Sequence, residues 1–174
     1  MKIFIPINEL APQYLNLTLP SITNQIGVQP EDIIQVFTPL PTDKTARWKV
    51  LAKTACKERM LKVKDNYLVI NDFEFKNLYN QNYSDMKSFL DRNPDYGAVS
   101  LFRKRAIPIF KYDPRIPSHI CNGIIMFRKA ALKDVDFGLF PTQPSCLSVG
   151  KSLHNAGWNY GYMAMTIRCE KLIG

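Results

Sequence analysis

The sequence predicts an α/β protein built on a mixed, mainly parallel sheet with helices on its faces. Short β-rich runs alternate with stretches of helical periodicity along the chain, which is the pattern of parallel strands joined by helical crossovers. One run, "YLVI" at residues 67–70, is apolar at every position, as expected of a central strand covered on both faces. No repeat or linker-like segment interrupts the alternation, so we expect residues 1–174 to form a single domain.

The first part of the chain predicts the order strand, helix, strand, helix, strand. The strands are expected at residues 2–7, 32–37 and 67–70. Apolar residues at helical spacing indicate a helix over residues 14–26, with Pro20 near a helix start or at a kink because proline removes a backbone donor. A longer helix is expected from residue 44 to 63, with its N-cap at Thr42 and Asp43.

The rest of the chain predicts a more mixed β-α arrangement. Strands are expected at residues 97–102, 123–127 and 160–167, and helices at residues 83–94, 128–135 and 146–158. Ser84 is the expected cap of the first of these helices, and Gly157 is expected to end the last one.

The composition is that of an ordinary globular protein, with 46% hydrophobic and 22% charged residues. No apolar run is long enough to cross a bilayer, and the apolar stretch after Lys2 is too short for a signal-peptide core, so we expect a cytoplasmic location. The cysteines are widely spaced and form no zinc or disulfide pattern. We expect them to be buried or half-buried thiols: Cys56, Cys121, Cys146 and Cys169.

The formal net charge of +8 is concentrated in two clusters. One lies between Lys44 and Lys64, and the other is the run Arg103-Lys104-Arg105. Such clusters favour polyanionic partners, such as nucleic acid, nucleotide phosphates or an anionic membrane surface. The first cluster is equally typical of a solvated helix face.

Asp72 and Glu74 directly follow the predicted central strand. Ligands of open α/β sheets bind beyond the carboxyl ends of the strands, where we expect the loops at residues 6–9, 38–43 and 71–74 to meet. Paired carboxylates there suit Mg²⁺ or Mn²⁺, which would keep waters and substrate phosphates in its other positions and neutralise a diphosphate leaving group. The same residues are also typical of the polar end of a buried strand.

Six segments, taken in order, resemble those of GT-A fold glycosyltransferases. They are "PINE" (6–9), Ser21-Ile22-Thr23-Asn24-Gln25 in the first helix, "TDKT" (42–45), "KDNYLVINDFEF" (64–75) at the DxD metal motif, "NGIIMFRKAAL" (122–132) and "LHNAGWNYGYM" (153–163). The resemblance covers nearly the whole chain. It implies a minimal GT-A domain, with a nucleotide-sugar-binding half at residues 1–76 and an acceptor-side half at residues 77–174.

The resemblance also implies a transferase that uses Mg²⁺ or Mn²⁺ and a nucleotide sugar, with a UDP-sugar as the expected donor. Asp72 and Glu74 would hold the metal and the diphosphate, with Asn71 beside them. The remaining contacts would come from Pro6, Asn8 and Asp43, which would line the nucleotide, and from Arg47, Lys53 or Arg59, which would reach its phosphates.

The sequence departs from the family pattern at several positions. The second strand ends in "VFTPLP", without an acidic residue for the base, and the metal motif reads Asp-x-Glu. Inverting members place a general base where this chain has Ser145-Cys146, and a retaining mechanism would remove the need for one. The nearest substitutes are Asp136, Asp134 and Asp113, and His154 or His119 is a candidate third metal ligand. The chain is also short for this fold, which implies that acceptor-binding elements are trimmed or supplied by the acceptor or a partner subunit.

Size and charge suggest DNA as the acceptor. The profile resembles small viral enzymes that glycosylate hydroxymethylated pyrimidines, acting in the cytoplasm of a host cell. Duplex phosphates would bind the basic residues, and position 5 of a pyrimidine already faces the major groove. Lipid-linked and polysaccharide acceptors remain alternatives, and the oligomeric state stays open.

Two other functions fit parts of the same sequence. Glu74-Phe75-Lys76 with an upstream acidic residue, Asp43, Asp65 or Asp72, is also the pattern of a Mg²⁺-dependent nuclease. A nuclease would lose cleavage on Lys76→Ala, whereas a transferase would keep sugar transfer. The missing general base and the altered DxD motif also suit a non-catalytic relative that only binds nucleic acid or a partner.

Overall fold

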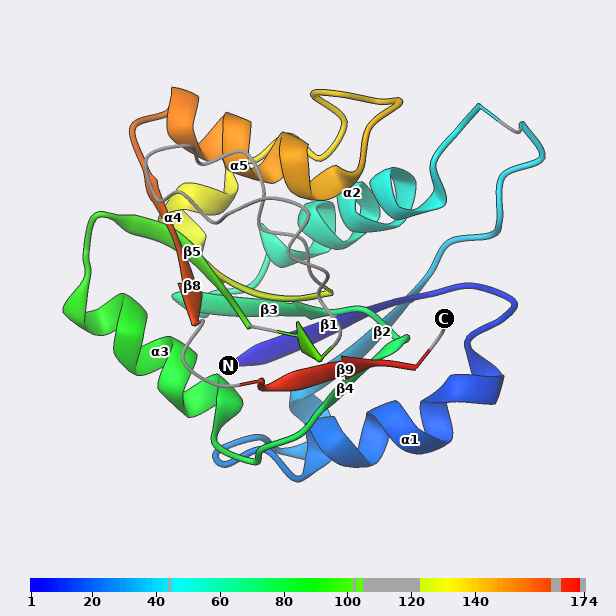
Figure 1. Cartoon of the computed structure of the whole chain (residues 1–174), viewed down its shortest axis with the longest axis horizontal. Helices are drawn as coiled ribbons and strands as arrows, with labels where there is room; N and C mark the ends of the chain where they lie inside the picture. Colours follow the sequence, from blue (N-terminus) through cyan, green and yellow to red (C-terminus); the bar gives the residue numbers. More distant parts are fainter. Residues whose placement is uncertain (44, 102, 105–122, 164–166, 173–174) are drawn as a thin grey trace.

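The computed structural model describes residues 1–43, 45–101, 103–104, 123–163 and 167–172. Within them, a six-stranded sheet has the order β2-β1-β3-β7-β5-β8 (Figure 1). Its strands are β1 (Lys2–Ile7), β2 (Ile33–Phe37), β3 (Tyr67–Asn71), β5 (Tyr96–Leu101), β7 (Ile124–Arg128) and β8 (Asn159–Met163). Strand β7 runs antiparallel to both of its neighbours, and the other pairings are parallel. The predicted mixed, mainly parallel sheet is confirmed.

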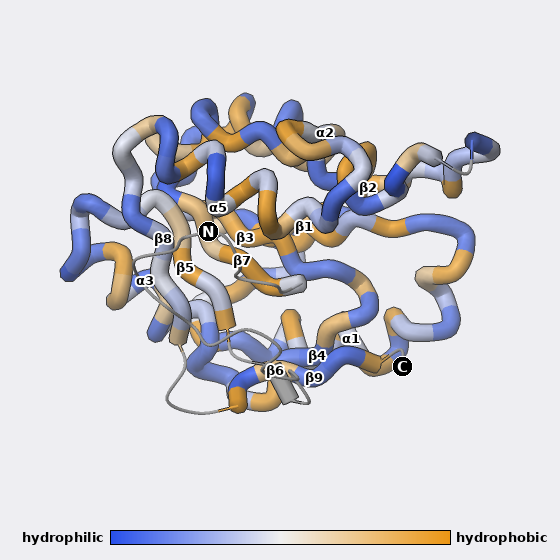
Figure 2. The backbone as a smooth tube through the Cα atoms, turned by 45° about the horizontal axis from the view of Figure 1, so that its top comes forward, coloured by the Kyte–Doolittle hydropathy of each residue, from blue (hydrophilic) through white to orange (hydrophobic). Residues whose placement is uncertain are grey.

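Helices cover both faces of this sheet, and Figure 2 shows apolar segments gathered where they meet it. The helices are α1 (Pro12–Thr23), α2 (Trp48–Met60), α3 (Asn82–Arg92), α4 (Lys129–Leu132) and α5 (Ser145–Asn155). Side chains alternate between the faces of a strand, so Phe4 packs in the core with α2, α4 and α5, whereas Ile3 and Ile5 pack in the core with α1 and α3. Burial on both faces explains why β1 and β3 are almost continuously apolar.

A second, three-stranded sheet has the order β4-β9-β6. Its strands are β4 (Phe75–Asn77), β6 (Arg103–Lys104) and β9 (Cys169–Lys171). None of these three strands was predicted, because runs of two or three residues carry no measurable period. The predicted last strand at 160–167 corresponds to β8, and β9 is the true last strand among the described residues.

Several predicted helix boundaries are wrong, each for a local reason. Helix α2 begins at Trp48 rather than near residue 44, because Asp43 accepts hydrogen bonds from the amide and hydroxyl of Thr45 in a separate turn. Pro20 lies inside α1, so the alternative that placed it near a helix start is wrong. Ser84 donates back to the carbonyl of Gln81 and does not cap α3.

The predicted role of Gly157 at the end of α5 is confirmed, although the helix ends at Asn155 rather than near residue 158. Gly157 has a φ of +87°, which glycine adopts without strain, directly after the helix. The expectation for the cysteines also holds where it can be checked, since Cys56, Cys146 and Cys169 are buried, and Cys121 lies outside the described residues. Of the helices in the described ranges, none has the length and apolar character that a membrane span requires.

Gly123 supports the turn that follows β3. Its carbonyl accepts a hydrogen bond of 2.7 Å from the amide of Asp72, and a Cβ atom at Gly123 would lie 2.1 Å from the ring of Phe75. We expect Gly123→Ala to lower the free energy of unfolding by about 1–3 kcal/mol, since the ring must move. Chemical denaturation measures this, with Gly138→Ala as the control, because there the nearest side-chain atom is 3.4 Å away. Equal effects of the two substitutions would contradict the prediction.

Candidate functional site

The loops that follow β1 and β2 contact each other, as the sequence predicts. The amide of Thr38 donates to the carbonyl of Ile7 at 2.9 Å, and the amide of Leu40 donates to Glu9 Oε2 at 3.0 Å. The indole of Trp48, at the start of α2, donates to the carbonyl of Thr38 at 2.7 Å. These bonds fix the beginning of α2 beside the carboxyl ends of the first two strands.

The turn after β3 joins this group through Phe73. Its ring packs against Tyr14 of α1 and Trp48 of α2, with ring centroids 5.9 Å apart in both pairs. The hydroxyl of Thr18 donates to the carbonyl of Phe73. These contacts of Phe73 with α1 and α2 fix the position of the turn, and with it the positions of Asp72 and Glu74 on either side of Phe73 in the sequence.

Asn71 organises the turn from inside the protein. Its amide donates to the carbonyls of Asp72 and Phe75, both at 3.0 Å. Its side-chain oxygen accepts hydrogen bonds from Asn77 and from the hydroxyl of Tyr83. Asn71 is fully buried, so in this structure it holds the carboxylate turn rather than facing a cavity beside Asp72 and Glu74.

Two lysines of α2 lie against the two carboxylates. The ammonium of Lys49 lies 3.5 Å from Asp72 Oδ2 and contacts Glu74 Oε1, and that of Lys53 lies 3.6 Å from the same Asp72 oxygen. The side chains of Asp72, Glu74 and Lys53 are 2%, 10% and 4% exposed, whereas Lys49 is 41% exposed. Lys53 also donates to the hydroxyl of Ser145 at 3.4 Å. Lys53 is therefore locked inside the protein, and Lys49 reaches the surface.

The carboxylates change the protonation of their neighbours. Burial acts to lower the pKa of Lys49, but the attraction of Asp72 and Glu74 outweighs it, so this pKa is raised above its ordinary value. The ion pairs therefore stabilise the fold below the ordinary lysine pKa and are lost only as the pH rises through the higher value of the folded state. Burial also raises the pKa of the Cys56 thiol to about 12, and Asp72 adds to this effect. Cys56 stays protonated at neutral pH and is a poor nucleophile.

A cavity of about 290 Å³ opens beside this group of charges, a volume close to the smallest ligand pockets. It is lined by Arg47, Trp48, Lys49, Val50, Lys53, Phe75, Pro144, Ser145, Cys146 and Lys171. Basic residues from α2 and β9 thus line the cavity, and the N-terminus of α5 lies at its wall. Such a cavity favours an anionic ligand.

Asp72 and Glu74 are the right kind of ligand for a divalent cation, but the position between them is filled. Asp72 Oδ1 is buried and has no hydrogen-bond partner among the described residues, which suits a hard cation. The ammonium of Lys49, however, bridges the two carboxylates. No cluster of three or more His, Cys, Asp or Glu side chains that could hold a metal occurs in the described part of the chain. With Lys49 in this place, the residues do not fit Mg²⁺ or Mn²⁺.

Other predicted donor-site residues are divided between this cavity and more distant places. Arg47 lines the cavity, and its guanidinium also donates to the carbonyl of Thr142 at 2.9 Å. Pro6 is buried within β1, and Asn8 is a loop residue whose side-chain oxygen accepts from the amide of Leu10. Asp43 is exposed in the loop between β2 and α2, which projects from the body of the protein (Figure 1).

The structure does not bring Arg59, His154 or Asp136 to the carboxylates. Arg59 is ten residues after Lys49 on α2, or about 15 Å along the helix axis. His154 is exposed near the end of α5, whose first residue, Ser145, lines the cavity. The amide of Asp136 bonds to Ser152, also late in α5. Asp134 accepts from the indole of Trp158, and the candidates Asp113 and His119 lie outside the described residues.

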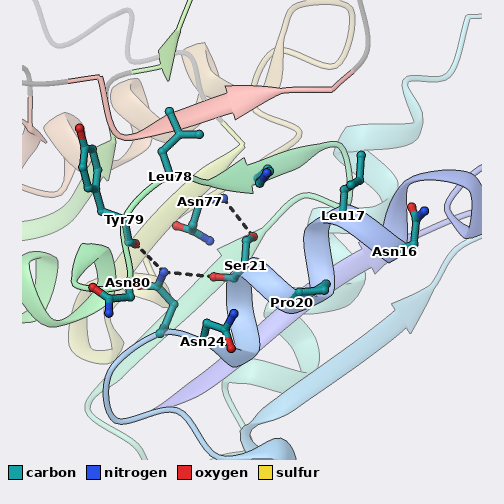
Figure 3. A pocket seen from close by; sticks show the side chains of 11 residues that line it. Asn16, Leu17, Pro20, Ser21, Asn24, Asn77, Leu78, Tyr79 and Asn80 are labelled. Atoms are coloured by element: carbon teal, nitrogen blue, oxygen red, sulfur yellow. Dashed lines mark hydrogen bonds between the residues drawn. The ribbon is translucent and has the colours of Figure 1, made fainter.

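Lys76 does not line the cavity beside the carboxylates. A second cavity, of about 400 Å³, lies between α1 and the chain around β4 (Figure 3). Lys76 lines it, whereas the preceding residue, Phe75, lines the cavity beside Lys49. Successive residues of a strand point to opposite faces, so Lys76 points away from Phe75. The carboxylates of Asp72 and Glu74 pair with Lys49 rather than with Lys76. The arrangement of two carboxylates with Lys76 that a nuclease requires is not formed.

Sequence reasoning missed the most informative residues of the site. Lys49 appeared only as one charge in a basic cluster, although Lys49 and Lys53 are spaced i, i+4 and therefore share one face of α2. That spacing, directly after a strand and a loop, was a usable signal. Lys171 gave none, because it reaches the site only through the pairing of β9 with β4.

Comparisons with known proteins agree with this architecture. No family model matches the sequence, and no curated protein matches it. Among solved structures, S. aureus TarS in complex with UDP-GlcNAc is 13% identical with a TM-score of 0.64, over 98% of this chain and 58% of that chain. The mannosyltransferase PcManGT from Pyrobaculum calidifontis, in complex with GDP-Man and Mn²⁺, is 14% identical with a TM-score of 0.64, over 99% of this chain and 56% of that chain.

A third similar structure is closer in length. A197 from STIV is 12% identical with a TM-score of 0.53, over 94% of this chain and 82% of that chain. By contrast, the chain spans 60% of the TarS 1–349 chain and 37% of the longer TarS chain. At these identities the likeness establishes the fold alone: an α/β sheet flanked by helices that resembles the GT-A glycosyltransferases.

Proposed function

We propose that this chain is a glycosyltransferase that takes its sugar from a nucleotide-sugar donor. The observation that carries the proposal is the basic cavity beside Asp72 and Glu74, at the carboxyl edge of β3. Two of the structural neighbours, TarS and PcManGT, hold UDP-GlcNAc and GDP-Man, which supports a donor of this class. The donor site draws on both predicted halves of the domain, since Lys49 and Lys171 both line it.

In the proposed reaction, the bond between the sugar and the donor diphosphate breaks as an acceptor oxygen bonds to the sugar. The nucleoside diphosphate leaves with the bonding electron pair, and the acceptor hydroxyl gives up its proton to a base. Arg47, Lys49 and Lys171 line the cavity, where their charges would offset the negative charge that develops on the leaving diphosphate. Ser145, at the position expected for a general base, is bonded to Lys53 instead.

Donor binding is tested by thermal unfolding with a panel of UDP-sugars and GDP-mannose, with and without Mn²⁺. A donor at about 100 times its Kd should stabilise the fold by about 2.7 kcal/mol, which raises the Tm by roughly 5–10 °C for a chain of this size. Lys171→Gln should reduce the shift, whereas Lys62→Gln, at an exposed position beyond α2, should not. If no nucleotide sugar stabilises the protein, with or without metal, the proposal is wrong.

We further propose hydroxymethylated DNA as the acceptor. Support comes from the net charge of +8 and from Arg59, Lys62 and Lys64, which are exposed at and beyond the end of α2. Incubation with the donor should add one sugar mass to the modified base, as measured by mass spectrometry of the digested DNA. DNA binding should also weaken steeply with salt, in proportion to the phosphates contacted. An unchanged base mass with every donor that binds would exclude DNA and leave lipid-linked or polysaccharide acceptors.

A further inference from the structure

The positive charge at the centre of the site is a side chain of the protein, the ammonium of Lys49. The ammonium of Lys49 lies between Asp72 and Glu74, and its distance from the centroid of the Phe75 ring is 5.7 Å. Two carboxylates and the face of an aromatic ring therefore hold one positive charge. Because Lys49 also lines the cavity, this charge is within reach of an anionic ligand.

The two carboxylates of the site are neutralised without a metal ion. Asp72 and Glu74 are offset by Lys49 and Lys53. Two further basic residues, Arg47 and Lys171, line the cavity and leave an excess of two positive charges. That excess matches a diphosphate group. A divalent cation would double it, and would have to bind to Asp72 beside the ammonium of Lys53, whose side chain is 4% exposed.

We propose that Lys49 takes the place of a divalent cation in this site, so that the site binds the diphosphate of its donor without a metal ion. The inference rests on the proposed function for the identity of the ligand. Lys49, rather than Lys53, has this role because Lys53 is almost completely buried and donates to Ser145. Asp72 and Glu74 position the ammonium of Lys49 instead of coordinating a metal.

The first test measures Mn²⁺ binding in the absence of any nucleotide, by electron paramagnetic resonance titration. The wild-type protein should bind Mn²⁺ at least about 10-fold more weakly than Lys49→Gln, because the substitution removes the competing ammonium. Lys151→Gln, at an exposed position on α5, is the matched control and should behave like the wild type. Tight Mn²⁺ binding by the wild type that Asp72→Asn abolishes would overturn the proposal.

The second test uses UDP as the probe, in calorimetric titrations with excess EDTA or with Mn²⁺. The affinity of the wild type should agree within about twofold between the two conditions, and Lys49→Gln should lose about 10-fold in EDTA. UDP binding that requires Mn²⁺ would overturn the inference while supporting the proposed function. If neither UDP nor GDP binds in any condition, the proposed function fails, and the Mn²⁺ titration still decides whether Lys49 excludes the metal.

Discussion

Asp72→Asn should lower the rate of sugar transfer by at least about 100-fold, the effect of removing one preorganised charge from an active site. Asp72 ion-pairs with both Lys49 and Lys53, so its loss leaves Lys49 with Glu74 alone and leaves Lys53 without a partner of opposite charge among the described residues. The prediction holds whether the cation of the site is the ammonium of Lys49 or a divalent metal ion, because both would depend on the carboxylate of Asp72. Transfer of radiolabelled sugar to the acceptor, or to water, measures the rate.

Glu58→Gln is the matched control for this substitution. Glu58 is exposed on α2 and lies about 14 Å along the helix from Lys49, so its neutralisation should leave transfer unchanged. Far-ultraviolet circular dichroism separates lost activity from lost folding. If a folded Asp72→Asn protein keeps its rate within about threefold of the wild type, Asp72 has no part in the transition state.

Lys53→Met should lower the free energy of unfolding by about 3 kcal/mol, because it breaks a buried ion pair and leaves the Asp72 carboxylate with Lys49 alone as its cationic partner among the described residues. For a chain of this length the Tm should fall by roughly 6–12 °C. Lys53 is 4% exposed and lies 3.6 Å from Asp72, and methionine fills a similar volume, so the loss reflects charge rather than packing. Urea denaturation measures the change.

Lys57→Met, one turn later on α2, is the control. The ammonium of Lys57 donates to the carbonyls of Lys133 and Val135 and to no carboxylate among the described residues, so its loss should be smaller. A double-mutant cycle adds the decisive measurement. Lys53→Met combined with Asp72→Asn should cost less than the sum of the single changes, by about 1 kcal/mol or more. Simple additivity would mean that the two side chains do not interact.

The sequence predicted the sheet well because its strands carry strong signals. Strands β1 and β3 are buried on both faces, so nearly every position is apolar and the run is visible without a structure. The same reasoning located Asp72 and Glu74 at the carboxyl edge of β3, although it could not show what lies against them. The pairing of Lys49 with both carboxylates depends on where α2 begins, and Asp43 and Thr45 delay that start by a local turn.

The second sheet and Lys171 were beyond the reach of sequence patterns. Strands β4 and β9 have three residues each, too few to show a period of two. Their pairing joins residues nearly a hundred positions apart, with Phe75 opposite Lys171. Contacts between residues so far apart in the sequence depend on the assembled fold. The local sequence of β9, "CEK", does not predict them.

Because β9 pairs with β4 in the small sheet, the cavity can open while the main sheet stays folded. Lys171, the last residue of the three-residue strand β9, forms one wall of the cavity. The amide of the next residue, Leu172, donates a hydrogen bond to the carbonyl of Glu74. Short strands of a small sheet open with less free energy than a buried six-stranded core. On mild heating, the amide protons of β9 should therefore exchange with solvent before those of β1 and β3. The protein would then lose its hold on an anionic ligand while most of its secondary structure is still in place.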